Sequence, residues 1–370
     1  MTGYILTLGI FSGFYVIVLL LIFMGLGRLR VSTSDVEPFV SVVVAARNEE
    51  ENIQALLAAL TRQNYPSHLY EIIIIDDQST DRTATIVSSF DSHKVRLYRT
   101  TNRDQVISPK KKAIHLGIQK AKGEIILLTD ADCVPPECWI KGIVRLFTND
   151  VGMVIGFSPC ELPRLSFPVG DLLAIESLSL AAVAAGTSGL GYPATCNGRN
   201  LAYRKKVYEQ VGGFDKIQNF VSGDDDLLLK LVQASSWKIQ YAYDRRLVVP
   251  TKAVKNLRQF GNQRLRHASK GFHYHTGKVI GLILVYLYNV MIFFAVPLAL
   301  FQNLSAWVPI FFIGLKAASE FILLCRFAAA MDRLHYMPIF PIAELLHVPY
   351  VVIIGALGPL KKFKWKEKGN

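Results

Sequence analysis

The sequence predicts an α/β domain built on a mostly parallel sheet, with membrane-spanning helices before and after it in the chain. Of the 370 residues, 51% are hydrophobic and only 19% are charged. A soluble enzyme of this length rarely has such a composition, so part of the chain is expected to lie in lipid. In the middle of the chain, short apolar runs rich in β-branched residues alternate with helical patterns, which is typical of a parallel sheet.

The first apolar run covers residues 3–27 and carries no charge. It has the roughly 20 residues that a helix needs to cross a bilayer, and we expect a transmembrane helix over residues 1–28. A cleaved signal peptide is the weaker alternative, because no basic residues precede the run and no small-residue cleavage motif follows it. The positive-inside rule assigns Arg28 to the cytoplasm and the N-terminus to the outside.

Residues 31–37 read as a linker, and residues 38–250 as the α/β domain. The clearest buried strands are expected at Val40–Ala46, Glu71–Ile75, Lys94–Tyr98 and Glu124–Thr129. Helices should follow at Glu50–Arg62, Thr83–Asp91 and Lys111–Lys122. The apolar stretch Val169–Ala185 predicts either an amphipathic helix on the membrane surface or an ordinary core helix.

Residues 279–360 hold three more apolar segments, followed by a basic tail at residues 361–370. The segments are Val279–Phe301, Ala306–Leu324 and Ile339–Leu360. Three full crossings would leave the basic tail outside, against the positive-inside rule, so one segment is not expected to be a simple span. The proline-rich Ile339–Leu360 could be re-entrant, and Ala306–Leu324, with Lys316 and Glu320, could line a cavity or lie at the interface.

The net charge of +12 admits two partners, a nucleic acid or an anionic membrane surface. Residues 251–278 carry seven basic side chains and no acidic one, beside an apolar run. The segment has few aromatic side chains on which nucleic-acid bases could stack. A membrane surface is therefore favoured as the partner, and no nucleic acid is expected. Five cysteines without a CxxC pair predict reduced thiols in the cytoplasm.

Polar residues follow two predicted strands at the edge where ligands of open α/β sheets bind. Asn48 and Glu49 come after the first strand, and Asp76 and Asp77 after the second. An aspartate at this edge can accept hydrogen bonds from a uracil ring or a ribose. Helix capping is the structural alternative for Asn48 and for Asp81.

A third strand ends in Asp130-Ala-Asp132. Alternate residues of an extended segment point the same way, so both carboxylates can approach one cation. Carboxylates together with diphosphate oxygens are ligands that Mg²⁺ or Mn²⁺ accepts. The sequence therefore predicts a divalent metal at Asp132 and Asp130, with a solvated turn as the alternative.

Three consecutive acids, Asp224 to Asp226, open a later helix. They can simply stabilise the helix N-terminus. One of them can instead serve as the general base that takes a proton from an acceptor hydroxyl.

Together these motifs resemble the family-2 inverting glycosyltransferases, which have a GT-A fold. The resemblance runs from about Phe39 to Gly271 and rests on SVVVAARNEE, IIDDQSTDRT, LTDADC, CNGRNLAYRKKVYEQVGGFD and SGDDDL in order. Gln263-Arg264-Leu265-Arg266-His267 is similar to the family's Gln-x-x-Arg-Trp motif. The resemblance implies a GT-A nucleotide-sugar-binding domain in a membrane-bound enzyme.

The resemblance also implies residue roles. It assigns Asp225 as the base, with Asp224 as the rival, and Asp132 with Asp130 to the metal. The donor-binding residues that it implies are Ala45, Asn48, Glu49, Asp76, Asp77, Lys110, Asp130, Gln263, Arg264 and Arg266. Lys111 and Lys112 remain alternatives for the position of Lys110.

The implied reaction is transfer of a single sugar, with inversion, from a nucleotide sugar to a lipid or glycolipid acceptor. A UDP-sugar is favoured. His267 stands where processive members carry tryptophan, and few membrane segments are present, so a processive polysaccharide synthase is the weaker alternative. A catalytically inactive membrane scaffold is the third hypothesis. The expected location is a bacterial inner membrane, with the catalytic domain facing the cytoplasm.

Overall fold

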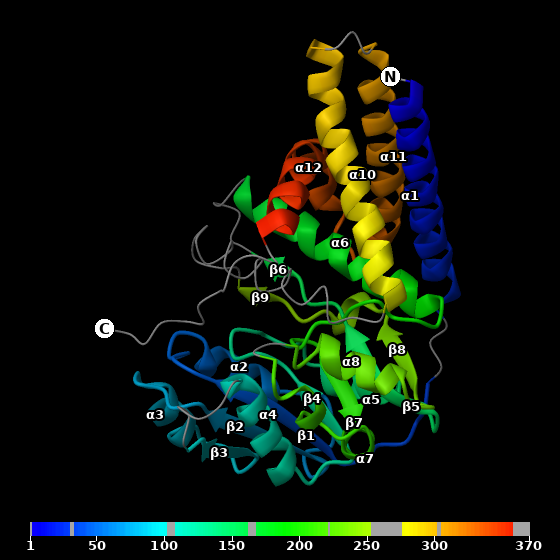
Figure 1. Cartoon of the computed structure of the whole chain (residues 1–370). Coiled ribbons are helices and arrows are strands. Elements are labelled where there is room, and N and C mark those ends of the chain that lie inside the picture. The colour runs from blue at the N-terminus through cyan, green and yellow to red at the C-terminus, as the bar shows by residue number, and fades with distance from the viewer. Residues whose placement is uncertain are drawn as a thin grey trace.

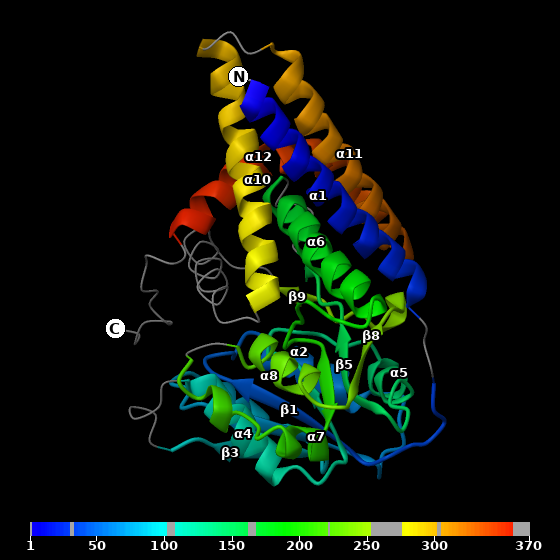
Figure 2. The ribbon, with the colours of Figure 1, turned by 45° about the vertical axis from the view of Figure 1, so that its right-hand side comes forward.

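The computed structural model describes residues 2–29, 33–101, 108–161, 168–220, 223–252, 276–301 and 305–357. These residues form an α/β domain at one end and a group of long apolar helices at the other (Figure 1). The N-terminus lies at the end of the helices that is remote from the domain (Figures 1 and 2).

A seven-stranded sheet forms the centre of the domain. Its strand order is β3-β2-β1-β4-β7-β5-β8. The strands are β1 (Val40–Ala46), β2 (Tyr70–Asp76), β3 (Val95–Arg99), β4 (Ile125–Leu128), β5 (Val151–Gly156), β7 (Leu201–Arg204) and β8 (Lys238–Ala242). Every pairing is parallel except those of β7, which runs antiparallel to both β4 and β5. The predicted mostly parallel sheet is confirmed, and each of the four expected strands is present.

The strands are buried because β-branched residues line both of their faces. Helices α2 (Ile53–Thr61), α3 (Thr83–Ser88) and α5 (Trp139–Val144) belong to the core on one face. Helices α4 (Pro109–Lys120), α7 (Lys205–Gln210) and α8 (Asp226–Gln233) belong to the core on the other face. The expected helix ends differ by a few residues: α2 begins at Ile53 rather than Glu50, and α4 begins at Pro109, since proline suits a first helical position.

Helix α6 (Val169–Gly189) lies between the sheet and the membrane helices (Figure 2). It is longer than expected and is apolar enough to cross a membrane by length and composition, yet it is far more deeply buried in protein than the other candidate spans. Gly25 of α1 (Thr2–Arg28) and Gly186 of α6 meet at the crossing: a Cβ added to Gly25 would lie 1.9 Å from the Gly186 carbonyl oxygen. The core-helix alternative for this segment therefore describes it better than a surface helix.

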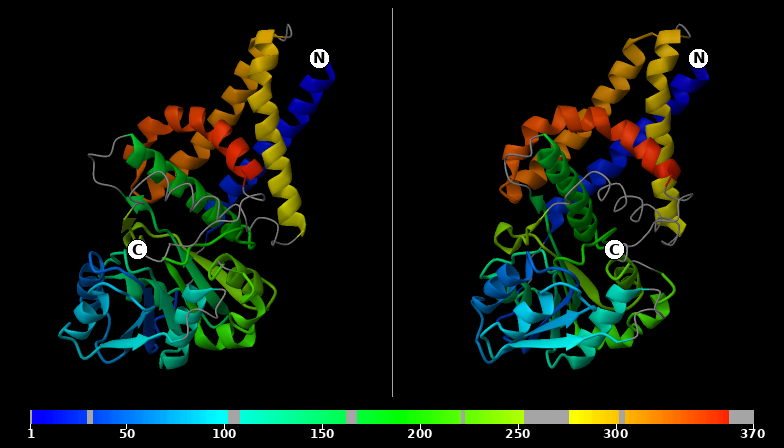
Figure 3. Two further views of the ribbon diagram at one scale, coloured as in Figure 1. Left: turned by 60° about the vertical axis from the view of Figure 1, so that its left-hand side comes forward. Right: turned by 90° about the vertical axis from the view of Figure 1, so that its left-hand side faces the viewer.

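Helices α1, α10 (Thr276–Phe301) and α11 (Trp307–Ala330) run away from the domain together (Figures 1 and 3). A short 3₁₀ helix, η6 (Leu334–Ile339), leads into α12 (Phe340–Leu357), which runs across the other helices instead of along them (Figure 3). Helix α12 thus differs in direction from the other long C-terminal helices, and the expectation that one C-terminal segment is not a simple span stays a prediction. The chain has five helices in its described part that are long and apolar enough to cross a membrane.

Two short strands, β6 (Cys160–Glu161) and β9 (Thr251–Lys252), pair beside the main sheet. Thr251 also bridges to Cys133, directly after the Asp130-Ala-Asp132 motif. The strand β9 therefore holds this motif against the end of the α/β domain that faces the helices.

Candidate active site at the carboxyl edge of the sheet

The parallel strands β1, β2 and β4 lie side by side and end at the same edge of the sheet. The polar segments that follow them are therefore brought together, as expected for an open α/β sheet. Asn48 and Gln78 in two of these segments have positive φ angles of 53° and 55°. Such backbone strain in residues other than glycine is typical of functional sites.

Several of the predicted nucleoside-binding residues hold this edge together. The Asn48 side-chain oxygen accepts a hydrogen bond from the Thr80 backbone N–H at 2.8 Å. Glu49 lies just before α2, and its carboxylate accepts from the Asn52 amide at 2.7 Å. The capping alternative for Asn48 is not what is observed, because its side chain joins the first strand end to the second.

Asp76 and Asp77 have different surroundings. Asp76 is fully buried, accepts from the Ser79 backbone N–H at 3.0 Å and pairs with Arg99 at 3.0 Å. Asp77 accepts from the Thr100 hydroxyl at 2.9 Å, and burial raises the pKa of its carboxyl. Ala45, at the end of β1, is partly buried in register with Ile75, just before the two aspartates.

A lysine joins two of the acidic motifs. The Lys110 ammonium lies 2.9 Å from Asp130 Oδ1 and 3.2 Å from Asp224 Oδ2. The neighbouring lysines are directed elsewhere: Lys111 donates to the carbonyls of residues 217 and 220, and Lys112 to the carbonyl of residue 101. Of the three lysines considered from the sequence, Lys110 is the one beside the acids.

The two aspartates of the Asp130-Ala-Asp132 motif have pKa shifts in opposite directions because their charged neighbours differ. Burial alone would raise the pKa of Asp130, but the Lys110 ammonium outweighs it and holds this pKa below its usual value. Burial and the nearby Asp130 charge raise the pKa of Asp132. The two partly buried carboxylates lie on one turn, and Lys110 pairs with Asp130 rather than with Asp132. Such a pair of carboxylates is a donor set that fits a hard divalent cation.

The third acidic motif begins α8. Gly223 has a φ of +94°, which favours glycine, and it precedes the three aspartates. Asp225 accepts from the backbone N–H of Asp226 at 2.7 Å and of Gly198 at 3.3 Å. Asp226 accepts from the Thr195 hydroxyl at 2.8 Å and the Cys196 N–H at 3.0 Å. Asp225 and Asp226 therefore hold the 195–199 loop against the site, while Asp224 faces Lys110.

Arg199, on that loop, was not predicted. Its positive charge favours the ionised form of both Asp130 and Asp132, although burial and the Asp130 charge keep the pKa of Asp132 raised. Its guanidinium donates to Asn197 at 3.1 Å and to the Ser158 carbonyl at 3.2 Å, which fixes its direction. The one sequence signal for Arg199 is its position in the CNGRN segment. Strand β7 begins just after that segment and pairs with β4, the strand that precedes Asp130 and Asp132.

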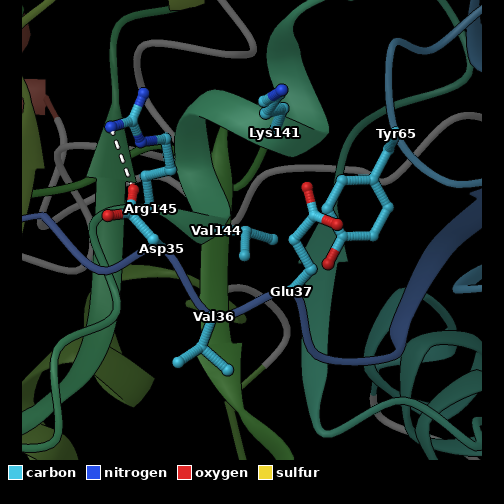
Figure 4. A pocket seen from close by; sticks show the side chains of 7 residues that line it. All are labelled: Asp35, Val36, Glu37, Tyr65, Lys141, Val144 and Arg145. Carbon is cyan, nitrogen blue, oxygen red and sulfur yellow. Dashed lines mark hydrogen bonds and ion pairs between the residues drawn. The ribbon is translucent and has the colours of Figure 1, made fainter.

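The predicted Gln263, Arg264 and Arg266 lie outside the described residues, as do most of the basic segment 251–278 and the tail at 361–370. Figure 4 shows a shallow hollow of about 270 Å³ on another part of the domain, between the linker and α5. Its lining includes Glu37, Tyr65, Lys141 and Arg145. It lies where the linker enters β1, at the strand end opposite to the acids.

The chain is similar to known glycosyltransferases. Residues 41–165 match the model of glycosyl transferase family 2, and residues 125–343, more than half of the chain, match that of glycosyl transferase family group 2. The glycosyltransferase AglE of Haloferax volcanii is 30% identical over 210 residues, 56% of this chain and 65% of that protein. A beta-monoglucosyldiacylglycerol synthase of Nostoc sp. is 28% identical over 236 residues, 64% of this chain and 49% of that protein.

The matches thus span about half to two thirds of these curated relatives. A solved structure, the mannosyltransferase PcManGT of Pyrobaculum calidifontis in complex with GDP-Man and Mn²⁺, superimposes with a TM-score of 0.58 at 18% identity. The superposition covers 97% of this chain and 98% of that one, and it supports the GT-A fold. This chain belongs to glycosyl transferase family group 2.

Proposed function

We propose that this chain is a membrane-embedded, inverting glycosyltransferase that transfers one sugar from a nucleotide-sugar donor to a lipid-type acceptor. The observation that carries the proposal is the convergence of two acidic motifs, Asp130-Ala-Asp132 and Asp224–Asp226, at Lys110, with Arg199 beside the first of them. A site that must hold a diphosphate, a cation and a reacting hydroxyl needs both signs of charge at close range.

The nucleoside is assigned to the edge formed by Asp77, Asn48 and Ala45, with Asp76 and Glu49 holding that edge in shape. Asp77 is buried, and its carboxylate accepts a hydrogen bond from the Thr100 hydroxyl at 2.9 Å. A uridine nucleotide is favoured. The solved relative of this fold that binds GDP-Man makes a guanosine donor the second choice to be tested.

Asp130 and Asp132 would hold Mg²⁺ or Mn²⁺. The bound cation would help neutralise the charge that develops on the leaving diphosphate. Lys110 and Arg199 supply further positive charge on either side of the two aspartates. We also propose that the diphosphate is bound by Gln263, Arg264 and Arg266.

Asp225 is proposed as the base. Its two carboxylate oxygens are held by the N–H groups of Asp226 and Gly198, so the carboxylate is fixed in direction. Asp225 would take the proton of the acceptor hydroxyl as that oxygen attacks the anomeric carbon from the face opposite the diphosphate, which gives inversion. Asp224 is the less suitable candidate, because it pairs with Lys110.

The acceptor is proposed to be a lipid because a group of apolar helices adjoins the domain on the side of α6 (Figure 2). The names of several relatives, such as the beta-monoglucosyldiacylglycerol synthase, refer to lipid acceptors. With Arg28 on the cytoplasmic side, α1, α10 and α11 would cross the membrane and the domain would face the cytoplasm. Since α12 runs across the others, the basic tail would also return to the cytoplasmic side.

Donor hydrolysis by the purified full chain in detergent tests the proposal, across UDP- and GDP-sugars with and without Mn²⁺. Cleavage of one donor that depends on the metal and is lost in Asp132→Ala would support it. Failure to bind any nucleotide, measured by calorimetry, would favour the scaffold hypothesis. Products longer than one added sugar, seen by mass spectrometry, would favour the processive alternative.

A further inference from the structure

A second group of ionisable side chains lies among the membrane helices. Lys316 of α11 lies 2.7 Å from Glu320 of the same helix and 2.6 Å from Glu344 of α12. The Lys316 ammonium is also 3.2 Å from His347 Nδ1. Tyr15 of α1 donates its hydroxyl hydrogen to Glu320. We call Lys316, Glu320, Glu344 and His347 the intramembrane cluster.

The intramembrane cluster is enclosed by protein. Lys316 is fully buried, and Glu344 is only 8% exposed. Tyr288 of α10, also fully buried, packs against Tyr15 with ring centroids 4.9 Å apart and closes the cluster from a fourth helix. Ionisable residues are rarely buried in membrane segments, and where they occur they mark a functional site.

The charges of the intramembrane cluster do not balance. Lys316 contributes one positive charge, whereas Glu320 and Glu344 contribute two negative charges if both are ionised. The side chains beside the two carboxyls include Lys316, Tyr15 and His347. A net negative charge enclosed in the membrane would cost several kcal/mol or more, so one additional positive charge is required.

The contacts within the cluster indicate what supplies that charge. Glu320 and Glu344 both pair with Lys316, and a carboxylate oxygen of each lies within 4.8 Å of the other and of a His347 ring nitrogen. His347 does not carry the charge: an ammonium can only donate, so the Nδ1 that faces Lys316 is an acceptor and the ring is neutral. The position between the carboxylates and His347 that another cation would take is filled by the Lys316 ammonium.

We propose that the intramembrane cluster is a binding site for one proton, shared between Glu320 and Glu344 and held by Lys316, His347 and Tyr15. With that proton the cluster is neutral and joins α1, α11 and α12. Tyr15 is 13 residues from Arg28 on α1, which is roughly 20 Å along the helix. The site is therefore separate from the candidate active site, and the inference is independent of the proposed function.

Infrared difference spectroscopy of the full chain in detergent tests for the proton directly. The spectrum of the wild type minus that of Glu344→Gln should show the loss of a protonated carboxyl stretch that shifts in D₂O. Glu320→Gln should show the same loss, because the remaining glutamate then pairs with Lys316 as a carboxylate. Glu124→Gln is the control, since Glu124 pairs with Arg204 at the domain surface and should lose carboxylate bands alone. Loss of carboxylate bands alone in Glu344→Gln would overturn the proposal.

Thermal unfolding of charge variants provides a second test. Either single glutamine variant should keep its unfolding midpoint within about 2 °C, since glutamine resembles the protonated acid in shape and charge. Glu320→Gln/Glu344→Gln should lower the midpoint by roughly 5 to 15 °C, because Lys316 loses both counter-ions. Adding Lys316→Met to that pair should restore most of the loss. A single variant as unstable as the double variant would contradict the proposal, as would a stoichiometric metal ion that Glu344→Gln removes.

Discussion

The candidate active site and the intramembrane cluster are both built from one lysine between two carboxylates. Lys110 lies between Asp130 and Asp224, and Lys316 between Glu320 and Glu344. The Lys110 side chain is 28% exposed, whereas that of Lys316 is fully enclosed. Asp225 lies near the first lysine, and Asp132 and Arg199 lie near its partner Asp130. A histidine and a tyrosine belong to the surroundings of the second lysine.

The difference shows that the same ion pair can serve two purposes. Under the proposed function, the surplus acids of the candidate active site at the sheet edge (the sheet-edge site) would hold a cation, and the lysine would add positive charge for the diphosphate. In the membrane the lysine occupies the central position itself, and the carboxylates serve the packing of helices. Variants that remove one member of each set should therefore affect different properties.

The largest expected effect comes from Asp132→Ala in the sheet-edge site. If Asp132 holds the cation, donor turnover should fall about 100- to 1,000-fold while the fold is retained. Turnover at saturating Mn²⁺, with the thermal midpoint measured on the same sample, checks this. Asp150→Asn is the control, because Asp150 pairs with Lys238 at the surface, and it should keep full activity. Equal loss in both variants would contradict the assignment.

Replacing each lysine by methionine tests the comparison itself. Lys110→Met should lower turnover about 10- to 100-fold with little change in thermal stability, since the side chain is partly exposed. Lys316→Met should instead leave turnover per folded molecule unchanged and lower the unfolding midpoint by several degrees. If Lys316→Met lowers turnover as much as Lys110→Met does, the two sites are coupled and the separation argued above is wrong.

The crossing of α1 and α6 provides a contrast without charges. A Cβ at Gly186 would lie 2.4 Å from the Ile22 carbonyl oxygen, so Gly186→Ala should force the helices apart and cost about 1 to 3 kcal/mol. Chemical or thermal unfolding in one detergent measures the loss. Gly13→Ala is the matched control, because a Cβ there meets nothing within 4 Å, and it should be neutral or slightly stabilising.

Arg199→Lys is a finer test of the sheet-edge site. The lysine keeps the charge near Asp130 and Asp132 but loses the fixed direction given by Asn197 and Ser158. We expect roughly a tenfold fall in kcat/KM for the donor and no change in the unfolding midpoint. An unchanged kcat/KM would remove Arg199 from the proposed site.

The smallest expected effect comes from Tyr15→Phe in the intramembrane cluster. The substitution removes one hydrogen bond to Glu320 and keeps the contact between this ring and that of Tyr288. The cost should be about 1 kcal/mol, or a few degrees in the unfolding midpoint. A loss as large as that of the double glutamine variant would mean that Tyr15 has a larger part in holding the proton than proposed.

Local patterns predicted most of the fold. The strands at Val40–Ala46 and Glu71–Ile75 are apolar runs that end in polar residues, and short-range chemistry is enough to locate them. The antiparallel direction of β7 could not be predicted in this way, because it depends on pairing with β4 and β5 across long loops. The length of α6 was underestimated because Gly186 and Gly189 weaken a helical pattern, yet both are needed where the helix meets α1.

The same limit applies to the candidate site. Acids that directly follow strands, such as Asp130, were found because motif and strand end coincide. Arg199 was missed because its proximity to Asp132 arises from tertiary pairing alone. Among the charged residues of the membrane segments, Lys316 and Glu320 pair with each other inside the helix group, while the Arg326 guanidinium packs on the Phe23 ring at 4.2 Å. Sequence spacing gave no sign that Glu344 and His347, from another segment, complete that cluster.

The close crossing of α1 and α6 also limits the reach of the enzyme. With the two backbones in contact at Gly25 and Gly186, no layer of side chains is present there in which α6 could slide. The segment after α6 leads directly to the loop that Asp225 and Asp226 hold. With the helices in a membrane as proposed, these acids would stand at a set height above the hydrocarbon boundary. Under the proposed function, a head group whose hydroxyl stands at another height would not be glycosylated, and acceptors would be sorted by length before any recognition of their chemistry.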